Sequence, residues 1–227
     1  MISTKTRKKG FYAMRLRHKK NFVPRMEKVS YLLAKTNEEG VIDLAATFGE
    51  IKQLYLEIGC GKGAFVAELS RRHPDVSILA VERVSDVLLM AMEKADREGC
   101  KNVAFSNENA DRIDIILPEK SVDKLFLNFS DPWPRKKNAK RRLTSPLFLE
   151  RYKKILKDGA KIHFKTDNIG LFEYSLETLK EAGFTLYNVC YDLHASELNE
   201  ENIMTEYERN FSAQGFKINY LEAVLNS

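Results

Sequence analysis

The sequence has few of the residues that build metal sites and disulfides. Its 227 residues include three cysteines and four histidines. No two cysteines have the C-x-x-C spacing of a zinc or redox site, and the histidines form no cluster in the sequence. No apolar run approaches the roughly 20 residues that span a bilayer, and the N-terminus has no apolar signal-peptide segment. We therefore expect no metal, no membrane association and a cytoplasmic location.

Positive charge is distributed unevenly. Residues 1 to 28 contain ten Lys and Arg against one acid, about +9, although the whole chain has a formal net charge of +5. A second block of six cations lies between Arg135 and Arg142. Because such blocks bind phosphates by releasing counterions, they suggest a polyanionic partner. A solvated tail and one charged helix face are an equally good interpretation of the charge alone. We divide the chain into a flexible basic arm, residues 1–30, and a single domain, residues 31–227.

Short apolar runs alternate with helical segments from residue 54 onward. This pattern predicts an α/β fold, with a mostly parallel sheet covered by helices on both faces. Ser145 or Thr144 and Pro146 mark the start of one helix and Gly159 its end, and another helix is expected over 169–182. The predicted strands are 54–59, 77–82, 102–108, 123–130, 160–167, 184–191 and 216–224.

A glycine-rich turn follows the first predicted strand. Gly59, Gly61 and Gly63 permit positive φ and close approach of a ligand to the backbone. Glu57 precedes them, and Glu82 ends the second predicted strand, where a carboxylate accepts ribose hydroxyls. The combination predicts a nucleoside cofactor, with a purely structural glycine turn as the alternative.

Two features favour S-adenosylmethionine over NAD. Glu57 would repel a pyrophosphate but suits the ammonium of a methionine moiety, directly or through water. The last third of the chain reads as two further sheet strands rather than a second nucleotide-binding half. Asn109, just after the third strand, is placed to accept from an adenine amine, although an ordinary loop Asn is the simpler interpretation.

The fourth predicted strand ends in the segment FSDPWP, residues 129–134. Prolines on both sides of Trp133 stiffen this tip. Asp131 offers two acceptor oxygens that match the N–H groups on the Watson–Crick edge of guanine, and Trp133 is placed to stack on a base or to support its pocket. The cations that follow would hold phosphates. A turn role for Asp131 and a core role for Trp133 are the alternatives.

With these motifs the chain resembles the bacterial tRNA (guanine-N7)-methyltransferases of the TrmB type. The resemblance rests on LEIGCGKG, NFSDPWP followed by KRRLT, FKTDN and TEYE, in that order, and covers about residues 15–224. It implies a Rossmann-like seven-stranded fold. It also implies methyl transfer from S-adenosylmethionine to the variable-loop guanosine, position 46, of tRNA. We expect a monomer or homodimer, and the sequence does not decide between them.

The resemblance also implies residue roles. The residues expected around the cofactor are Glu57, Gly59, Gly61, Gly63, Glu82, Asn109 and Asp131, and Asp131 is also the expected catalytic residue. The expected substrate contacts are Arg135, Asp167, Thr205, Glu206, Tyr207 and Glu208. The expected RNA contacts are Lys137, Asn138, Ala139, Lys140, Arg141 and Arg142.

Two positions depart from the family pattern, and other interpretations stay open. Asn109 stands where an aspartate is common, and Arg135 where a lysine is expected. Thr205 and Glu208 have the T-x-x-E spacing of a helix capping box. The alternative functions are a methyltransferase of another nucleobase or small molecule, and a noncatalytic tRNA-binding module.

Overall fold

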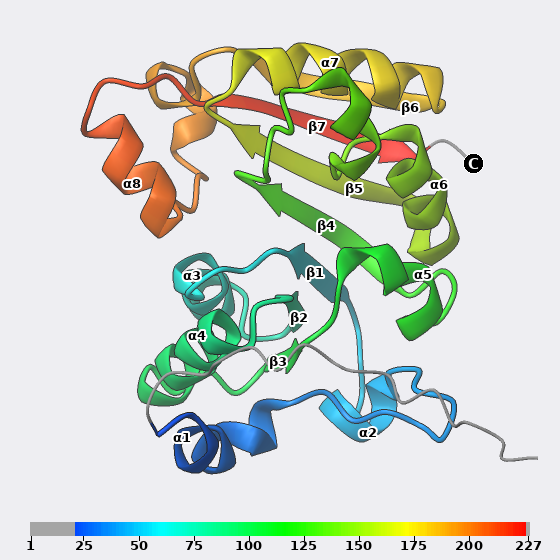
Figure 1. Cartoon of the computed structure of the whole chain (residues 1–227), viewed down its shortest axis with the longest axis vertical. Coiled ribbons are helices and arrows are strands. Elements are labelled where there is room, and N and C mark those ends of the chain that lie inside the picture. Colours follow the sequence, from blue (N-terminus) through cyan, green and yellow to red (C-terminus); the bar gives the residue numbers. More distant parts are fainter. Residues whose placement is uncertain (1–20, 226–227) are drawn as a thin grey trace, which may run out of the picture.

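The computed structural model describes residues 21–225 and contains one seven-stranded sheet (Figure 1). The strand order is β3-β2-β1-β4-β5-β7-β6, in which β7 runs antiparallel to both of its neighbours. The predicted seven-stranded Rossmann-like sheet with helices on both faces is confirmed. The strands are β1 (Leu54–Ile58), β2 (Ser77–Val81), β3 (Val103–Ser106), β4 (Val122–Asn128), β5 (Leu156–Thr166), β6 (Phe184–Cys190) and β7 (Asn219–Leu225).

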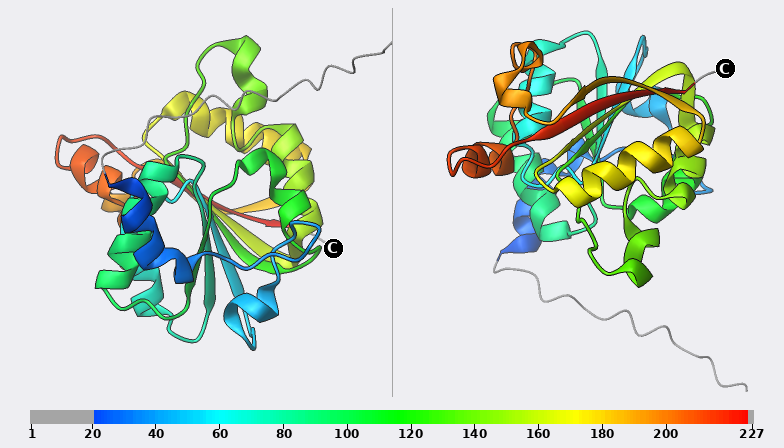
Figure 2. Two further views of the ribbon diagram at one scale, coloured as in Figure 1. Left: turned by 60° about the horizontal axis from the view of Figure 1, so that its bottom comes forward. Right: turned by 90° about the horizontal axis from the view of Figure 1, so that it is seen from above.

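Alternating side chains of the strands enter two cores on opposite faces of the sheet. On β1, Leu54, Leu56 and Ile58 pack into one core, whereas Tyr55 packs into the other. The first core lies under α5 (Ile113–Ile116), α6 (Pro146–Ile155) and α7 (Ile169–Glu181). The second lies under α1 (Phe22–Val29), α3 (Ala64–Arg72) and α4 (Ser85–Arg97). Figure 2 shows these helices on either side of the sheet, so β1 is buried on both faces, as its continuous apolar run indicates.

Short elements complete the edge of the sheet where the parallel strands end. They include the helix α8 (Glu206–Ser212) and the 3₁₀ turns η2 (Ala110–Arg112), η3 (Lys136–Arg141), η4 (Leu193–Ala195) and η5 (Glu197–Asn199). The turn η1 (Ser30–Leu32) and α2 (Leu44–Phe48) lie before β1. Because βα connections meet at this edge, it is the expected ligand-binding edge of such a sheet.

The predicted helix end at Gly159 is wrong. Helix α6 begins at Pro146 after the N-cap Ser145, as predicted, but it ends at Ile155 and runs directly into β5. Gly159 lies inside β5 with φ +75°, where the register against β4 jumps between Val122 and Lys124. A glycine with positive φ in a strand marks a bulge as readily as a helix end, and the local sequence does not distinguish them.

The predicted basic arm falls largely on residues 1–20, which lie outside the described residues. Its C-terminal part, however, is folded, because α1 packs on α4. The Arg25 guanidinium donates to both carboxylate oxygens of Glu93, at 2.7 and 2.6 Å, and Val29 is buried. Residues 22–30 of the expected arm are therefore part of the folded domain.

Candidate functional site

Two adjoining cavities lie at the C-terminal edge of the parallel strands. The large cavity, about 790 Å³, extends between the ends of β1, β2 and β4 toward η2 and α6. The small cavity, about 330 Å³, lies between the glycine turn and the start of α8. They share Gly59, Asn128 and Phe129 in their walls, so together they can hold one elongated ligand.

The glycine turn is fixed by backbone geometry and by Glu82. Gly63 has φ +78°, and a Cβ there would lie 2.9 Å from the Cβ of Ala91, so the start of α3 packs closely on α4. The carboxylate of Glu82 accepts from the backbone N–H of Gly61 at 3.2 Å and of Val84 at 2.9 Å. These bonds hold Glu82 in the wall of the large cavity, and its oxygens retain lone pairs for ligand hydroxyls.

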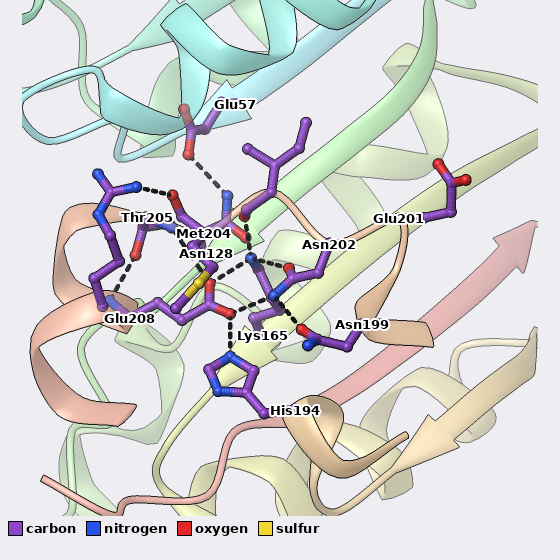
Figure 3. A network of polar contacts seen from close by, with 12 residues as sticks. Glu57, Asn128, Lys165, His194, Asn199, Glu201, Asn202, Met204, Thr205 and Glu208 are labelled. Carbon is purple, nitrogen blue, oxygen red and sulfur yellow. Dashed lines mark hydrogen bonds and ion pairs between the residues drawn. The ribbon is translucent and has the colours of Figure 1, made fainter. Parts of the chain in front are cut away.

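Glu57 is a buried carboxylate that lacks a full set of partners. Only 2% of its surface is exposed, and Oε1 accepts from Nδ2 of Asn128 at 2.8 Å (Figure 3). Its Oε2 and Oδ1 of Asn128 have no hydrogen-bond donor among residues 21–225. Burial raises the pKa of Glu57 to about 8, against the opposing effects of Asn128 and the Lys165 charge. Once the carboxyl of Glu57 loses its proton, the pair offers two unfilled acceptors to a cation in the small cavity, which both residues line.

Asn109 also lines the large cavity, where it caps η2. Its Oδ1 accepts from the backbone N–H of Asp111 at 3.3 Å, and its Nδ2 donates to Oδ2 of Asp111 at 3.1 Å. The amide is thus held at the predicted position after β3 by a capping interaction. An aspartate at this position would have no donor to make the second of these bonds.

The segment after β4 has a constrained backbone. Phe129 has φ 52° and Trp133 has φ 41°, a region that bulky side chains rarely adopt. Nε and Nη2 of Arg142 donate to the carbonyls of Pro132 and Trp133 at 3.0 and 3.1 Å. These bonds hold the turn in place, so Asp131 and Trp133 lie in the wall of the large cavity.

The cationic block does not act as one uniform surface. The guanidinium of Arg141 lies over the Trp133 ring, 4.8 Å from its centroid, and Lys140 and Arg141 both line the large cavity. Arg142 is half-buried between the Trp133 carbonyl and the Tyr174 ring, at 4.2 Å from that centroid. Arg142, one of the predicted RNA contacts, therefore holds the segment after β4 in place. Lys137, Asn138 and Ala139 lie on η3, and Arg135 begins it without lining either cavity.

The predicted substrate contacts near the C-terminus surround the small cavity with one exception. Thr205, Glu206 and Tyr207 line it, and Nζ of Lys62 in the glycine turn lies 2.9 Å from Oε1 of Glu206. The Tyr207 hydroxyl donates to Asp167 at 3.3 Å. Glu208 is fully buried and its side chain closes a capping box with Thr205. It is an anchor of α8 and lines neither cavity.

Asn128 and Lys165 are buried at this edge of the sheet and were not among the predicted site residues. Asn128 ends an apolar strand just before the conspicuous Asp131, and a polar residue there is the signal that could have found it. Lys165 stands in the apolar run of β5, where a lysine on the buried face requires a partner.

The residues present fit S-adenosylmethionine. The unfilled acceptors of Glu57 and Asn128 suit the ammonium of this cofactor. In the large cavity, Glu82 suits the ribose, and the part of the wall at Asn109 suits the adenine. Within residues 21–225 there is no group of three or more His, Cys, Asp or Glu placed to hold a metal ion. None of the helices in that range has the length and hydrophobicity of a transmembrane helix.

Comparisons with known proteins identify the family and the fold. A family model described as "Putative methyltransferase" matches residues 51–221. Among solved structures, the 16S rRNA methyltransferase KamB is 16% identical, with a TM-score of 0.64 over 86% of this chain and 99% of its own. An S-adenosylmethionine-dependent methyltransferase from Aquifex aeolicus is 17% identical, with a TM-score of 0.56 over 88% of this chain and 97% of its own. A 16S rRNA adenine methyltransferase from Catenulisporales acidiphilia, solved with S-adenosylmethionine, is 12% identical, with a TM-score of 0.54 over 78% of this chain and 87% of its own.

Proposed function

The chain belongs to this family of putative methyltransferases, and we propose that it transfers a methyl group from S-adenosylmethionine to nitrogen 7 of a guanosine in tRNA. S-adenosylmethionine-dependent methyl transfer follows from the family and from the fold it shares with such enzymes. The guanosine, its place in the variable loop and the tRNA are the proposal.

One observation supports the proposal most strongly. Asp131 and Trp133 stand in the wall of the cavity that is suited to the cofactor, and Lys140 and Arg141 stand in the same wall. An acceptor-only carboxylate, an aromatic ring and two cations next to one methyl donor are the groups that recognise guanine and an adjacent phosphate.

The chemistry asks little of the protein beyond positioning. Bound S-adenosylmethionine supplies an electrophilic methyl group, and nitrogen 7 of guanine carries a lone pair that attacks without prior deprotonation. Asp131 would accept from the N–H groups of the guanine Watson–Crick edge. Since those groups become more acidic as the purine gains positive charge, the carboxylate stabilises the transition state more than the ground state. Alignment of the base by the rigid turn supplies the rest.

The RNA would approach along η3, toward the mouth of the large cavity. Lys137, Lys140 and Arg141 are exposed there, and the basic residues 1–20 add charge that suits a phosphate backbone. Arg142 would contribute indirectly, because its guanidinium is engaged by the carbonyls of Pro132 and Trp133.

The deciding experiment is incubation with labelled S-adenosylmethionine and unmodified tRNA, followed by mapping of the methylated base. We expect label at nitrogen 7 of one variable-loop guanosine. We expect Asp131→Asn to lower kcat by about 100-fold or more. The control is Asp158→Asn, whose exposed carboxylate pairs with Lys120 away from both cavities. Label on another base, or on free nucleosides as readily as on tRNA, would contradict the proposed substrate. Near-normal turnover of Asp131→Asn would contradict the role of that carboxylate.

A further inference from the structure

A buried polar network joins β5 to the start of α8 (Figure 3). Lys165 is 4% exposed. Its ammonium donates to Oε2 of Glu208 at 2.7 Å, to the Ile203 carbonyl at 2.7 Å and to Oδ1 of Asn202 at 3.0 Å. Nε2 of His194 lies 2.9 Å from the other carboxylate oxygen of Glu208. Four separate segments, β5, η4, the 199–204 connection and α8, therefore meet at one ion pair.

The hydrogen-bonding capacity of both charged groups is filled. Lys165 has three N–H donors, and each has an acceptor. The carboxylate of Glu208 is contacted by Lys165, His194, Asn202 and the backbone N–H of Thr205. A fully satisfied buried network favours one arrangement, because any other leaves a charge without partners. The network therefore fixes where α8 begins.

Helix α8 depends on such contacts, since its seven residues are too few to be stable alone. Its first turn carries Glu206 and Tyr207 into the wall of the small cavity. Glu206 pairs with Lys62 of the glycine turn, and the Tyr207 ring packs on Phe129 with centroids 5.0 Å apart. The network thus anchors the buried side of the Thr205–Tyr207 turn, whose outer side contacts the glycine turn through Glu206 and Lys62.

We propose that Lys165, Glu208 and His194 form a clamp that positions the Thr205–Tyr207 turn over the amino-acid end of the cofactor site, and that this clamp sets the affinity for ligands carrying the aminocarboxypropyl chain. They are positioning residues, because they act through α8 rather than by touching the cofactor. The positive charge of Lys165 also lowers the pKa of Glu57, against the larger effect of burial. The inference rests on the proposed function only in taking the cofactor to be S-adenosylmethionine, and no RNA enters it.

The test compares two ligands that differ only at that end. S-adenosylhomocysteine has the aminocarboxypropyl chain, and methylthioadenosine carries a methyl group in its place. For Lys165→Met, calorimetry is expected to show S-adenosylhomocysteine affinity reduced by about tenfold or more. A loss of this size is expected if the turn is correctly placed in about a tenth of the molecules or fewer. Methylthioadenosine affinity is expected to change by less than about twofold. Hydrogen exchange within residues 199–215 should rise locally.

Two further variants make the result interpretable. Lys161→Met removes a lysine of the same strand and face, which forms a partly buried pair with Glu222, and is expected to leave both affinities unchanged. His194→Ala, at a half-buried position, is expected to shift the affinities in the same direction as Lys165→Met but by less, and it carries the test if Lys165→Met does not fold. Equal losses for the two ligands, or no loss for either, would overturn the proposal. Failure of tRNA methylation would leave it unaffected.

Discussion

Replacement of Glu57 by Gln is expected to stabilise the ligand-free protein at alkaline pH while weakening cofactor binding. The carboxylate is buried against Asn128, and burial raises its pKa from 4.5 to about 8. An acid whose pKa is raised in the folded state stabilises the protein below its unfolded pKa, and this contribution is lost as the pH rises toward the folded value. Gln keeps the acceptor for the Asn128 amide but cannot ionise.

The magnitude follows from the two pKa values. The interval from 4.5 to about 8, at about 1.4 kcal/mol for each pH unit, corresponds to about 5 kcal/mol of unfolding free energy. The advantage of Glu57→Gln over the natural protein should therefore grow from about 1 kcal/mol at pH 5 to about 4.5 kcal/mol at pH 8.5. Urea unfolding of both proteins at these two pH values measures it.

Glu93→Gln is the matched control, because its expected effect has the opposite sign. The hydrogen bonds from Arg25 hold the pKa of Glu93 below its usual range, so that carboxylate stabilises the protein above pH 4.5 and its loss should destabilise. For Glu57→Gln, an advantage that is absent at pH 8.5, or that is the same at both pH values, would refute the reasoning.

Cofactor binding supplies the second half of the same prediction. An ammonium placed at Oε2 of Glu57 favours the ionised carboxylate, so binding of S-adenosylhomocysteine at pH 7 should release a proton. Calorimetry in buffers of different ionisation enthalpy would detect this proton. Glu57→Gln should bind more weakly and release none, and an unchanged proton count would contradict an ammonium at this carboxylate.

Three further predictions concern other parts of the site. Arg142→Ala should lower both kcat and thermal stability because it frees the carbonyls of Pro132 and Trp133, and activity and melting measurements on one preparation would test this. Arg141→Ala should instead raise the KM for tRNA and reduce its salt dependence by about one counterion with stability unchanged, and titration at several salt concentrations measures it. Gly63→Ala should cost about 2 to 4 kcal/mol in urea unfolding, because the new Cβ would lie 2.9 Å from that of Ala91 at a positive φ.

Local sequence signals identified the elements that lie within one stretch of chain. The apolar runs place all seven strands to within a few residues, and the glycine turn after β1 occurs where the spacing predicts it. These features depend on neighbours in the sequence, since strand burial, positive φ and helix capping are decided within a few residues. The same locality explains the error at Gly159, where a bulge and a helix end share one signal.

The sequence by itself determined the fold class, the edge of the sheet that holds the candidate site and the acid–tryptophan–cation segment after β4, because each depends on residues close together along the chain. Only the tertiary structure decided that Asn128 partners Glu57, 71 residues away, and that Lys165 and Glu208, 43 residues apart, anchor α8. It also separated Arg142, which braces the turn, from Arg141, which faces the cavity. The physical reason is burial: a charge that packing removes from water must be matched by partners brought to it by the fold, and sequence spacing does not record which partners those are.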